Sequence, residues 1–237
     1  MTERIIPLDK SVIVAADIKF SKLTELIEDT YLTEGIGGYK IGLTLALEKG
    51  LPGAVGKIKN KTNLPIIYDH QKGGNDIPEL GFKFAKVSKD SGVDAVILFP
   101  FVGPKSESDW IHACQDAGLG VIVGAHMTHK DFLKSQGGFI QDNIPDKIFT
   151  IAAENGVRDF VIPGNNVLLV RHYKELFDSL LGKDNFTLYA PGFITQGGVI
   201  SEFANVAGDK WHAIVGRDIY NAPDIRSAAR EITRKIK

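Results

Sequence analysis

The chain has 237 residues, of which 43% are hydrophobic and 24% charged, and its formal net charge is -1. A nearly neutral chain of this composition is neither disordered nor strongly basic, so we expect no nucleic acid and no membrane surface among its partners. Its length suits a single α/β barrel domain.

The cysteine content and the lengths of the apolar runs bear on location. Cys114 is the only cysteine, so no disulfide forms within one chain, and no Cys/His cluster has the spacing of a zinc site. The N-terminus has no charged-then-apolar leader, and no apolar run is long enough to cross a bilayer. We therefore expect a cytoplasmic protein in a reducing compartment.

Apolar runs rich in β-branched residues recur along the chain, with amphipathic segments between them. The runs are residues 11–16, 36–39, 66–68, 95–99, 120–124, 159–162, 186–189 and 212–215. The expected helices are residues 23–31, 44–59, 79–91, 106–117, 147–155, 167–181, 201–206 and 225–236. These units, with no linker between them, predict a single-domain (β/α)8 TIM barrel over residues 1–237. An open doubly wound sheet is the alternative, but its glycine-rich nucleotide turn is absent after the first run.

The stretch from residue 66 to 78 changes from an apolar run into alternating charges. Asp69, Lys72 and Asp76 follow the run, with Gly73-Gly74 between the last two. Charged groups are costly to desolvate unless paired, and ligands of α/β folds bind at the carboxyl ends of the strands. We interpret this stretch as the candidate active site. The alternative is a solvated loop with one ordinary ion pair.

Polar residues also follow other runs. They are Asp17, Lys40, Thr128 and Arg217, each at or just past the carboxyl end of its run. In a barrel these ends meet at one mouth. Because the first three strands are neighbours there, we expect Asp17 and Lys40 to lie within reach of the charges that follow the third strand, in an alternating network of acids and bases.

Two glycine-containing segments late in the chain form a second group. One is residues 190–198, APGFITQGG, and the other is residues 215–218, VGRD. Glycine-rich loops after the seventh and eighth strands, backed by a helix N-terminus and an arginine, are the usual phosphate site of this barrel. Gly197-Gly198 alone fits a plain turn equally well, but together with Gly216-Arg217 it favours phosphate binding.

The connection 126–146 is longer than ordinary loops, and such loops often form lids. His126 and His129 lie in it, and we expect them to satisfy loop backbone groups or to remain solvated. Trp110 is expected to pack in the core or between helices.

Together these segments resemble the orotidine 5'-phosphate decarboxylase family, particularly its compact archaeal-type members. The resemblance rests on Ala15-Ala16-Asp17, Tyr39-Lys40-Ile41-Gly42, residues 69–78, Met127-Thr128-His129, residues 191–198 and Val215-Gly216-Arg217, in this order. It implies decarboxylation of orotidine 5'-phosphate to UMP and CO2 in pyrimidine biosynthesis. It also implies a homodimer that needs no metal and no cofactor.

The resemblance implies four catalytic residues, which are Lys40, Asp69, Lys72 and Asp76, and it places Asp17 among the substrate-binding residues. Asp17 would bind the ribose hydroxyls, and Lys40 would pair with Asp69 and with the sugar. Asp69 would press on the substrate carboxylate and hold Lys72. Lys72 would be the proton donor.

The resemblance implies further contacts around this group. Asp76 and Ile77 would reach into the site of the partner subunit, which would make the dimer obligatory for activity. Thr128 would read the pyrimidine amide. The other expected substrate-binding residues are Pro191, Gln196, Gly197, Gly216 and Arg217, of which Gln196 and Arg217 would hold the phosphate.

The charged stretch departs from the family pattern. The family has Asp-x-Lys-x-x-Asp, whereas this chain has one extra residue in each gap. Because residues three apart on a strand do not share a face, we expect a bulge or turn at His70-Gln71 that returns Lys72 to Asp69. Leu80 also replaces the threonine that usually follows the proline by two residues, which puts one ribose contact from the partner subunit in doubt.

The predicted chemistry suits these residues. Loss of CO2 from a pyrimidine carbon leaves a localised carbanion, which a lysine fixed between acids can stabilise and protonate. One alternative is an Mg²⁺-dependent sugar-phosphate decarboxylase or aldolase of the same superfamily, which has an acid where this chain has Lys40. The other is a phosphate-ligand-binding barrel without catalysis.

Overall fold

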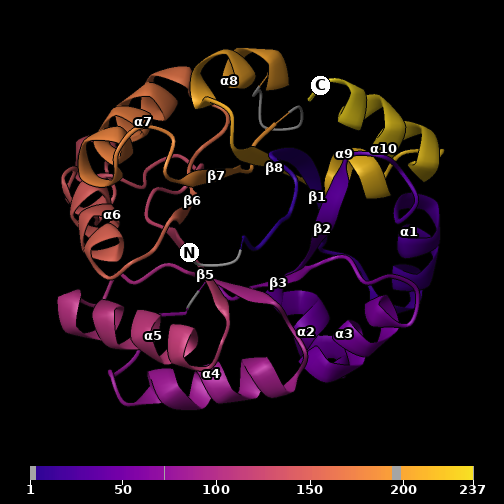
Figure 1. The fold of residues 1–237 in the computed structure, drawn as a ribbon, viewed down its shortest axis with the longest axis horizontal. Helices are drawn as coiled ribbons and strands as arrows, with labels where there is room; N and C mark the ends of the chain where they lie inside the picture. Colours follow the sequence, from indigo (N-terminus) through magenta and orange to yellow (C-terminus); the bar gives the residue numbers. More distant parts are fainter. Residues whose placement is uncertain (1–3, 72, 194–198, 237) are drawn as a thin grey trace.

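The structure is a computed structural model that describes residues 4–71, 73–193 and 199–236. Parallel strands β1 to β8 pair in sequence order and close into a barrel, because β8 also pairs with β1. Figure 1 looks into this barrel, with the helices in a ring around it. The predicted TIM barrel is therefore confirmed, and the open sheet is wrong.

The strands and helices follow the predicted order. The strands are β1 (Lys10–Ala16), β2 (Ile36–Ile41), β3 (Ile66–Asp69), β4 (Ala95–Leu98), β5 (Gly120–Gly124), β6 (Asp159–Val161), β7 (Thr187–Ala190) and β8 (Trp211–Val215). The helices are α1 (Leu23–Thr30), α2 (Leu43–Lys49), α3 (Leu51–Lys59), α4 (Leu80–Asp90), α5 (Pro104–Asp116), α6 (Ile144–Glu154), α7 (Val167–Leu181), α8 (Ile200–Ala207), α9 (Arg217–Tyr220) and α10 (Ile225–Arg234). Short 3-10 helices lie at Phe20–Lys22 and Lys134–Gln136.

The single helix expected over residues 44–59 is wrong. Gly50 has a φ of +72°, which ends α2, and Pro52 in the first turn of α3 restarts the helix. Glycine reaches this conformation without the steric cost that a side chain would add, and proline is tolerated in a first turn because its missing N–H has no partner there.

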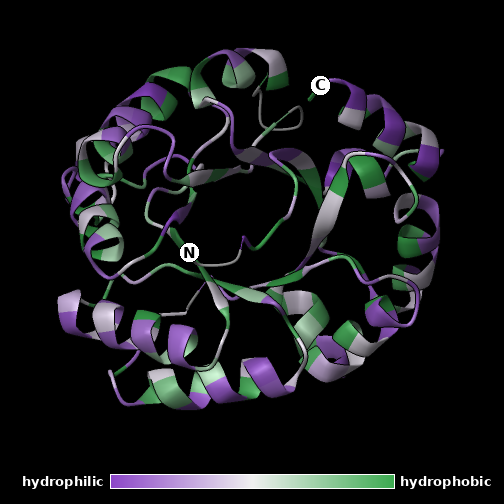
Figure 2. Cartoon of the chain, in the orientation of Figure 1, coloured by the Kyte–Doolittle hydropathy of each residue, from purple (hydrophilic) through white to green (hydrophobic). Residues whose placement is uncertain are grey.

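The strands are apolar on both faces because the barrel interior and the helical ring both cover them. One set of side chains, including Ile13, Ile67 and Ile214, packs inside the barrel, while their neighbours in sequence pack against the helices. Figure 2 shows hydrophilic residues gathered on the helical ring, most clearly along α4, α5 and α10. Successive side chains along each strand thus point alternately into the barrel and toward the helices, and this alternation determines which polar residues at the strand ends point inward.

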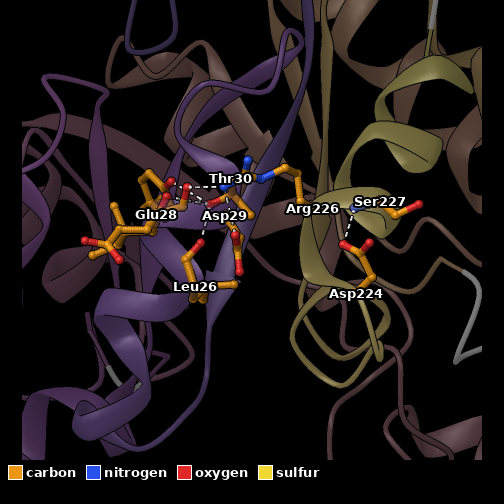
Figure 3. A network of polar contacts seen from close by, with 9 residues as sticks. Leu26, Glu28, Asp29, Thr30, Asp224, Arg226 and Ser227 are labelled. Atoms are coloured by element: carbon orange, nitrogen blue, oxygen red, sulfur yellow. Dashed lines mark hydrogen bonds and ion pairs between the residues drawn. The ribbon is translucent and has the colours of Figure 1, made fainter.

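Helices α1 and α10 are neighbours in the helical ring and are joined by an ion pair. Arg226 in α10 pairs with Asp29 of α1 at 3.1 Å, and Asp224 caps α10 by accepting a hydrogen bond from the backbone N–H of Ser227 at 2.8 Å (Figure 3). Within the described part of the chain, no helix has the length and apolar character needed to span a membrane.

Candidate functional site

A cavity of about 230 Å³ lies at the carboxyl ends of the strands. Its lining draws on several of the loops that follow the strands, as expected for this fold. The predicted residues that line it are Asp17, Lys40, Asp69, Thr128, Pro191, Gly216 and Arg217. The structure therefore brings these seven together, whereas Lys72, Gln196 and Gly197 lie outside the described residues.

Lys40 connects the two acids at the cavity wall. Its Nζ lies 2.9 Å from Asp69 Oδ2 and 3.3 Å from Asp17 Oδ1. Strand register places it there, because Lys40 is the partner of Ala15 on one side and of Ile67 on the other, both of which face the barrel interior. Burial lowers the pKa of Lys40, but Asp69 and Asp17 together raise it more, so its pKa is above the ordinary value and the ammonium is charged at neutral pH.

Asp69 follows Ile67 by two residues and so continues the inward row of β3. Its side chain is buried, and among the described residues Asp69 Oδ1 has no hydrogen-bond partner. A buried carboxylate oxygen without a donor costs free energy, and such oxygens are uncommon in folded proteins. Asp69 Oδ1 therefore keeps unused hydrogen-bonding capacity among the described residues.

The loop after β3 turns directly after the strand, because the N–H of Gly73 donates to the carbonyl of His70 at 2.6 Å. The expected return of Lys72 to Asp69 lies outside the described residues and stays a prediction. His70 faces away from the cavity, where its Nδ1 hydrogen bonds with the hydroxyl of Tyr68 at 2.7 Å and its ring packs on Phe84. Gln71 lines the cavity.

Asp76 and Ile77 lie apart from the cavity of their own chain. Both are exposed, with Ile77 at 59%, and neither lines the cavity. Their backbone carbonyls are nevertheless held, because Ser106 Oγ donates to Asp76 O at 2.8 Å and Trp110 Nε1 donates to Ile77 O at 3.1 Å. One chain alone therefore does not bring Asp76 to Lys40 and Asp69.

The expected phosphate end is formed by the segments after β7 and β8. Pro191, Gly216 and Arg217 line the cavity there, together with Phe193 and Tyr220. Arg217 begins α9 directly after Gly216. The arginine thus faces the same cavity as the Lys40 network, from the neighbouring side of the barrel where β8 meets β1.

His126 lines the cavity, contrary to expectation. It is buried, its Nδ1 hydrogen bonds with the hydroxyl of Tyr173 on α7 at 2.6 Å, and its ring lies 5.5 Å from that of Phe132. Burial lowers the pKa of His126, so the ring is neutral at pH 7. The signal was present in the sequence, because the inward row of β5 that includes Ile122 reaches residue 126 at a spacing of two.

The predicted lid, residues 126–146, is partly ordered by its own backbone. Leu133 and Ile140 form an isolated bridge, and Phe132 is buried beneath it while Phe139 is fully exposed. Movement of this segment over the cavity stays a prediction. Among the described residues no group of three or more His, Cys, Asp or Glu side chains could hold a metal ion.

Comparison with known proteins identifies the family. The model of the Orotidine 5'-phosphate decarboxylase / HUMPS family matches residues 10–232. The chain belongs to this family. The curated orotidine 5'-phosphate decarboxylase of Pyrococcus abyssi is 32% identical over 84% of this chain and 86% of that protein. The one of Pyrococcus furiosus is 31% identical over 95% of this chain and 97% of its own length.

Solved structures agree with this assignment. Orotidine 5'-phosphate decarboxylase from Pyrococcus horikoshii OT3 is 26% identical with a TM-score of 0.78, covering 95% of this chain and 98% of that one. The enzyme from Methanocaldococcus jannaschii, complexed with the inhibitor BMP, shares the fold at 24% identity with a TM-score of 0.80, covering 96% and 99%. The predicted family and the expectation of a decarboxylase are confirmed.

Proposed function

We propose that the protein converts orotidine 5'-phosphate to UMP and CO2 in pyrimidine biosynthesis. The observation that carries the proposal is the Asp17–Lys40–Asp69 network at the mouth of a barrel of this family, in which Asp69 Oδ1 has no partner among the described residues. A buried, fixed carboxylate of this kind suits a reaction in which a substrate carboxylate leaves as neutral CO2.

Charge placement supports the mechanism. Lys40 pairs with Asp69 Oδ2, and Asp69 Oδ1 is buried without a hydrogen-bond partner among the described residues, so the carboxylate is held in place at the cavity wall. Repulsion between Asp69 and the substrate carboxylate is relieved when CO2 departs. The electron pair left on the pyrimidine carbon then needs preorganised positive charge, and Lys72 supplies that charge and donates its proton to the carbon.

The order of residues around the mouth supports the binding mode. Arg217 after β8, with Pro191, Gln196, Gly197 and Gly216, binds the phosphate; Asp17 after β1 binds the ribose. Thr128 after β5 reads the pyrimidine amide. Phosphate binding remote from the reacting carbon supplies energy that aligns the ring with Asp69 and Lys72.

The proposed site is completed by a second copy of the chain. Asp76 and Ile77 are exposed and project from a loop at the mouth side of the barrel. Further exposed apolar side chains occur in the segments that follow β2 to β5: Leu43, Leu47, Phe82, Val102 and Phe139. Exposed apolar side chains of this size are common at interfaces between subunits, which supports a homodimer.

Lys40 also supports a reaction without a metal ion. Its ammonium already lies between the carboxylates of Asp17 and Asp69, where a divalent cation of the alternative sugar-phosphate enzymes would need an acid. We therefore propose that no metal and no other cofactor takes part. A strict Mg²⁺ requirement would instead favour that alternative.

The deciding experiment is the loss of orotidine 5'-phosphate absorbance on adding the protein, with and without EDTA. We expect turnover that EDTA leaves unchanged and that the Lys72→Ala variant lacks. Binding of UMP without any turnover would favour the non-catalytic binding barrel. A single domain over residues 1–237 and a cytoplasmic location stay predictions beside this proposal.

A further inference from the structure

The loop between β3 and α4 is fastened to the next unit of the barrel by hydrogen bonds. Gly73 O accepts a hydrogen bond from the N–H of Phe99 at 2.9 Å. The side chain of Asn75 bonds in both directions, donating from Nδ2 to Phe99 O at 2.6 Å and accepting at Oδ1 from the N–H of Phe101 at 2.8 Å. The backbone before Asp76 is therefore fixed to the connection between β4 and α5.

Helix α5 fastens the next two residues of the loop. Ser106 and Trp110 lie four apart, on one face of the helix, and donate to the carbonyls of Asp76 and Ile77. Both donors are buried. The indole approaches the loop closely because residue 81 is glycine: a Cβ there would lie 2.9 Å from Trp110 Cδ1.

These hydrogen bonds hold the backbone of the loop but leave two of its side chains exposed. The carbonyls of Asp76 and Ile77 point to α5, while the two side chains remain exposed. An exposed isoleucine on a tethered backbone is presented outward at little entropic cost, because its main chain is already ordered before any partner arrives.

We propose that Ser106 and Trp110 are positioning residues that act on the neighbouring subunit's site, by holding the Asp76–Ile77 segment in the conformation that enters it. The inference rests on the proposed function, in which Asp76 serves the second subunit. Neither residue touches the substrate in this scheme. Their effect is on catalysis across the interface, while the site of their own chain does not depend on them.

The test compares two mixed dimers that contain the same substitutions in different arrangements. Both are made by co-expressing chains with different affinity tags and purifying through both tags. In the trans dimer one chain carries Lys72→Ala and the other carries Ser106→Ala with Trp110→Phe. In the cis dimer one chain carries all three substitutions and the other is unaltered. Each dimer retains one intact Lys72.

The two arrangements have different expected activities. In the trans dimer the intact Lys72 receives its Asp76–Ile77 segment from a chain that keeps Ser106 and Trp110, so we expect about half the kcat of the unaltered dimer. In the cis dimer the segment comes from the altered chain, and we expect kcat/KM about tenfold lower than in the trans dimer. A tenfold loss equals about 1.4 kcal/mol, which is within the contribution of two hydrogen bonds.

Equal activities of the two dimers, or a lower activity in the trans dimer, would overturn the proposal, because a merely structural role would affect both arrangements alike. Ser106→Thr in place of Ser106→Ala, with Trp110 retained, keeps the hydroxyl and should restore the cis dimer. A dimer of Lys72→Ala and unaltered chains tests the underlying function separately. It should have half the activity, and failure of this control or of dimer formation would contradict the proposed function and this inference together.

Discussion

Lys40 places one cation against two carboxylates of unequal exposure, since Asp69 is buried while the side chain of Asp17 is 44% exposed. Water can solvate Asp17 if the lysine is lost, but it reaches Asp69 poorly. We therefore expect both stability and catalysis to depend on the ion pair with Asp69. Breaking a buried pair by removing one partner is more costly than replacing both partners.

The Lys40→Met variant should lose activity and also unfold more easily. Removal of the cation leaves Asp69 buried and uncompensated, and we expect a loss of about 2 kcal/mol in the free energy of unfolding. Adding Asp69→Asn should recover most of that stability without any activity. Urea unfolding of the two single variants and the double variant measures the coupling; additive losses would contradict a direct ion pair.

Arg217 allows a test of the phosphate end. Arg217→Ala should weaken binding of UMP by roughly 10- to 100-fold, because a charge-assisted contact to phosphate contributes about 1.5–3 kcal/mol. Binding of uridine, which lacks the phosphate, should hardly change. Inhibition constants of both compounds provide the comparison. Equal losses for UMP and uridine would place Arg217 elsewhere in the site.

Helix α5 buries an acid that the proposed mechanism does not use. Glu107 is 1% exposed, Glu107 Oε1 has no hydrogen-bond partner among the described residues, and burial raises its pKa to about 9. A carboxyl group whose pKa is higher in the folded than in the unfolded state stabilises the fold below about pH 4.5, and this stabilisation is lost as the pH rises toward 9.

Glu107→Gln should remove this pH dependence. At pH 8 we expect the variant to unfold at higher urea concentration than the unaltered chain, by a free energy on the order of 3 kcal/mol, since one pKa unit corresponds to about 1.4 kcal/mol. At pH 5 the two should differ little. The exposed Glu154 on α6 provides the control, since Glu154→Gln should have no effect at either pH.

The seam at which the barrel closes contains a buried histidine. Ser11 of β1 and His212 of β8 are register partners, and Ser11 Oγ hydrogen bonds with His212 Nδ1 at 2.8 Å. Burial lowers the pKa of His212 to about 3, with Arg4 adding to the decrease and Asp9 opposing it. The neutral ring therefore stabilises the fold fully above about pH 6.5, and that contribution is lost as the pH falls toward 3.

His212→Asn keeps a hydrogen-bonding group beside Ser11 but cannot be protonated. The variant should lose less stability than the unaltered chain between pH 7 and pH 4.5, as measured by thermal unfolding. Burial raises the pKa of Asp159 to about 6, so this carboxyl group stabilises the fold as the pH falls over part of this range. The slope of stability against pH in the His212→Asn variant should therefore be close to zero or of the opposite sign. His112→Asn, at an exposed position, is the control.

At the scale of the whole molecule, the barrel could be predicted because each strand is apolar on both faces and each is followed by an amphipathic segment. Asp17, Lys40 and Asp69 could be predicted because parallel strands place their carboxyl ends together. The break at Gly50 could also have been predicted, because Gly50 and Pro52 signal the end of one helix and the start of the next. The bonds from Ser106 and Trp110 were missed because no periodicity relates a helix donor to a carbonyl about thirty residues earlier.

The exposed position of Asp76 leads to the last prediction. Chains with Lys72→Ala and chains with Asp76→Ala should each be inactive alone, and mixing them should restore about a quarter of the unaltered activity. With random exchange about half the dimers are mixed, and each mixed dimer has one site that carries both substitutions and one that carries neither.

The matched control is a mixture of Lys72→Ala with Asp69→Asn chains. Asp69 belongs to the cavity of its own chain, 2.9 Å from Lys40, so in this mixture every site keeps one defect and no activity should return. Recovery is measured after exchange has been verified with differently tagged chains. If neither mixture regains activity despite subunit exchange, Asp76 acts within its own chain. The extra residues of the loop after β3 would then have rebuilt the site within one subunit.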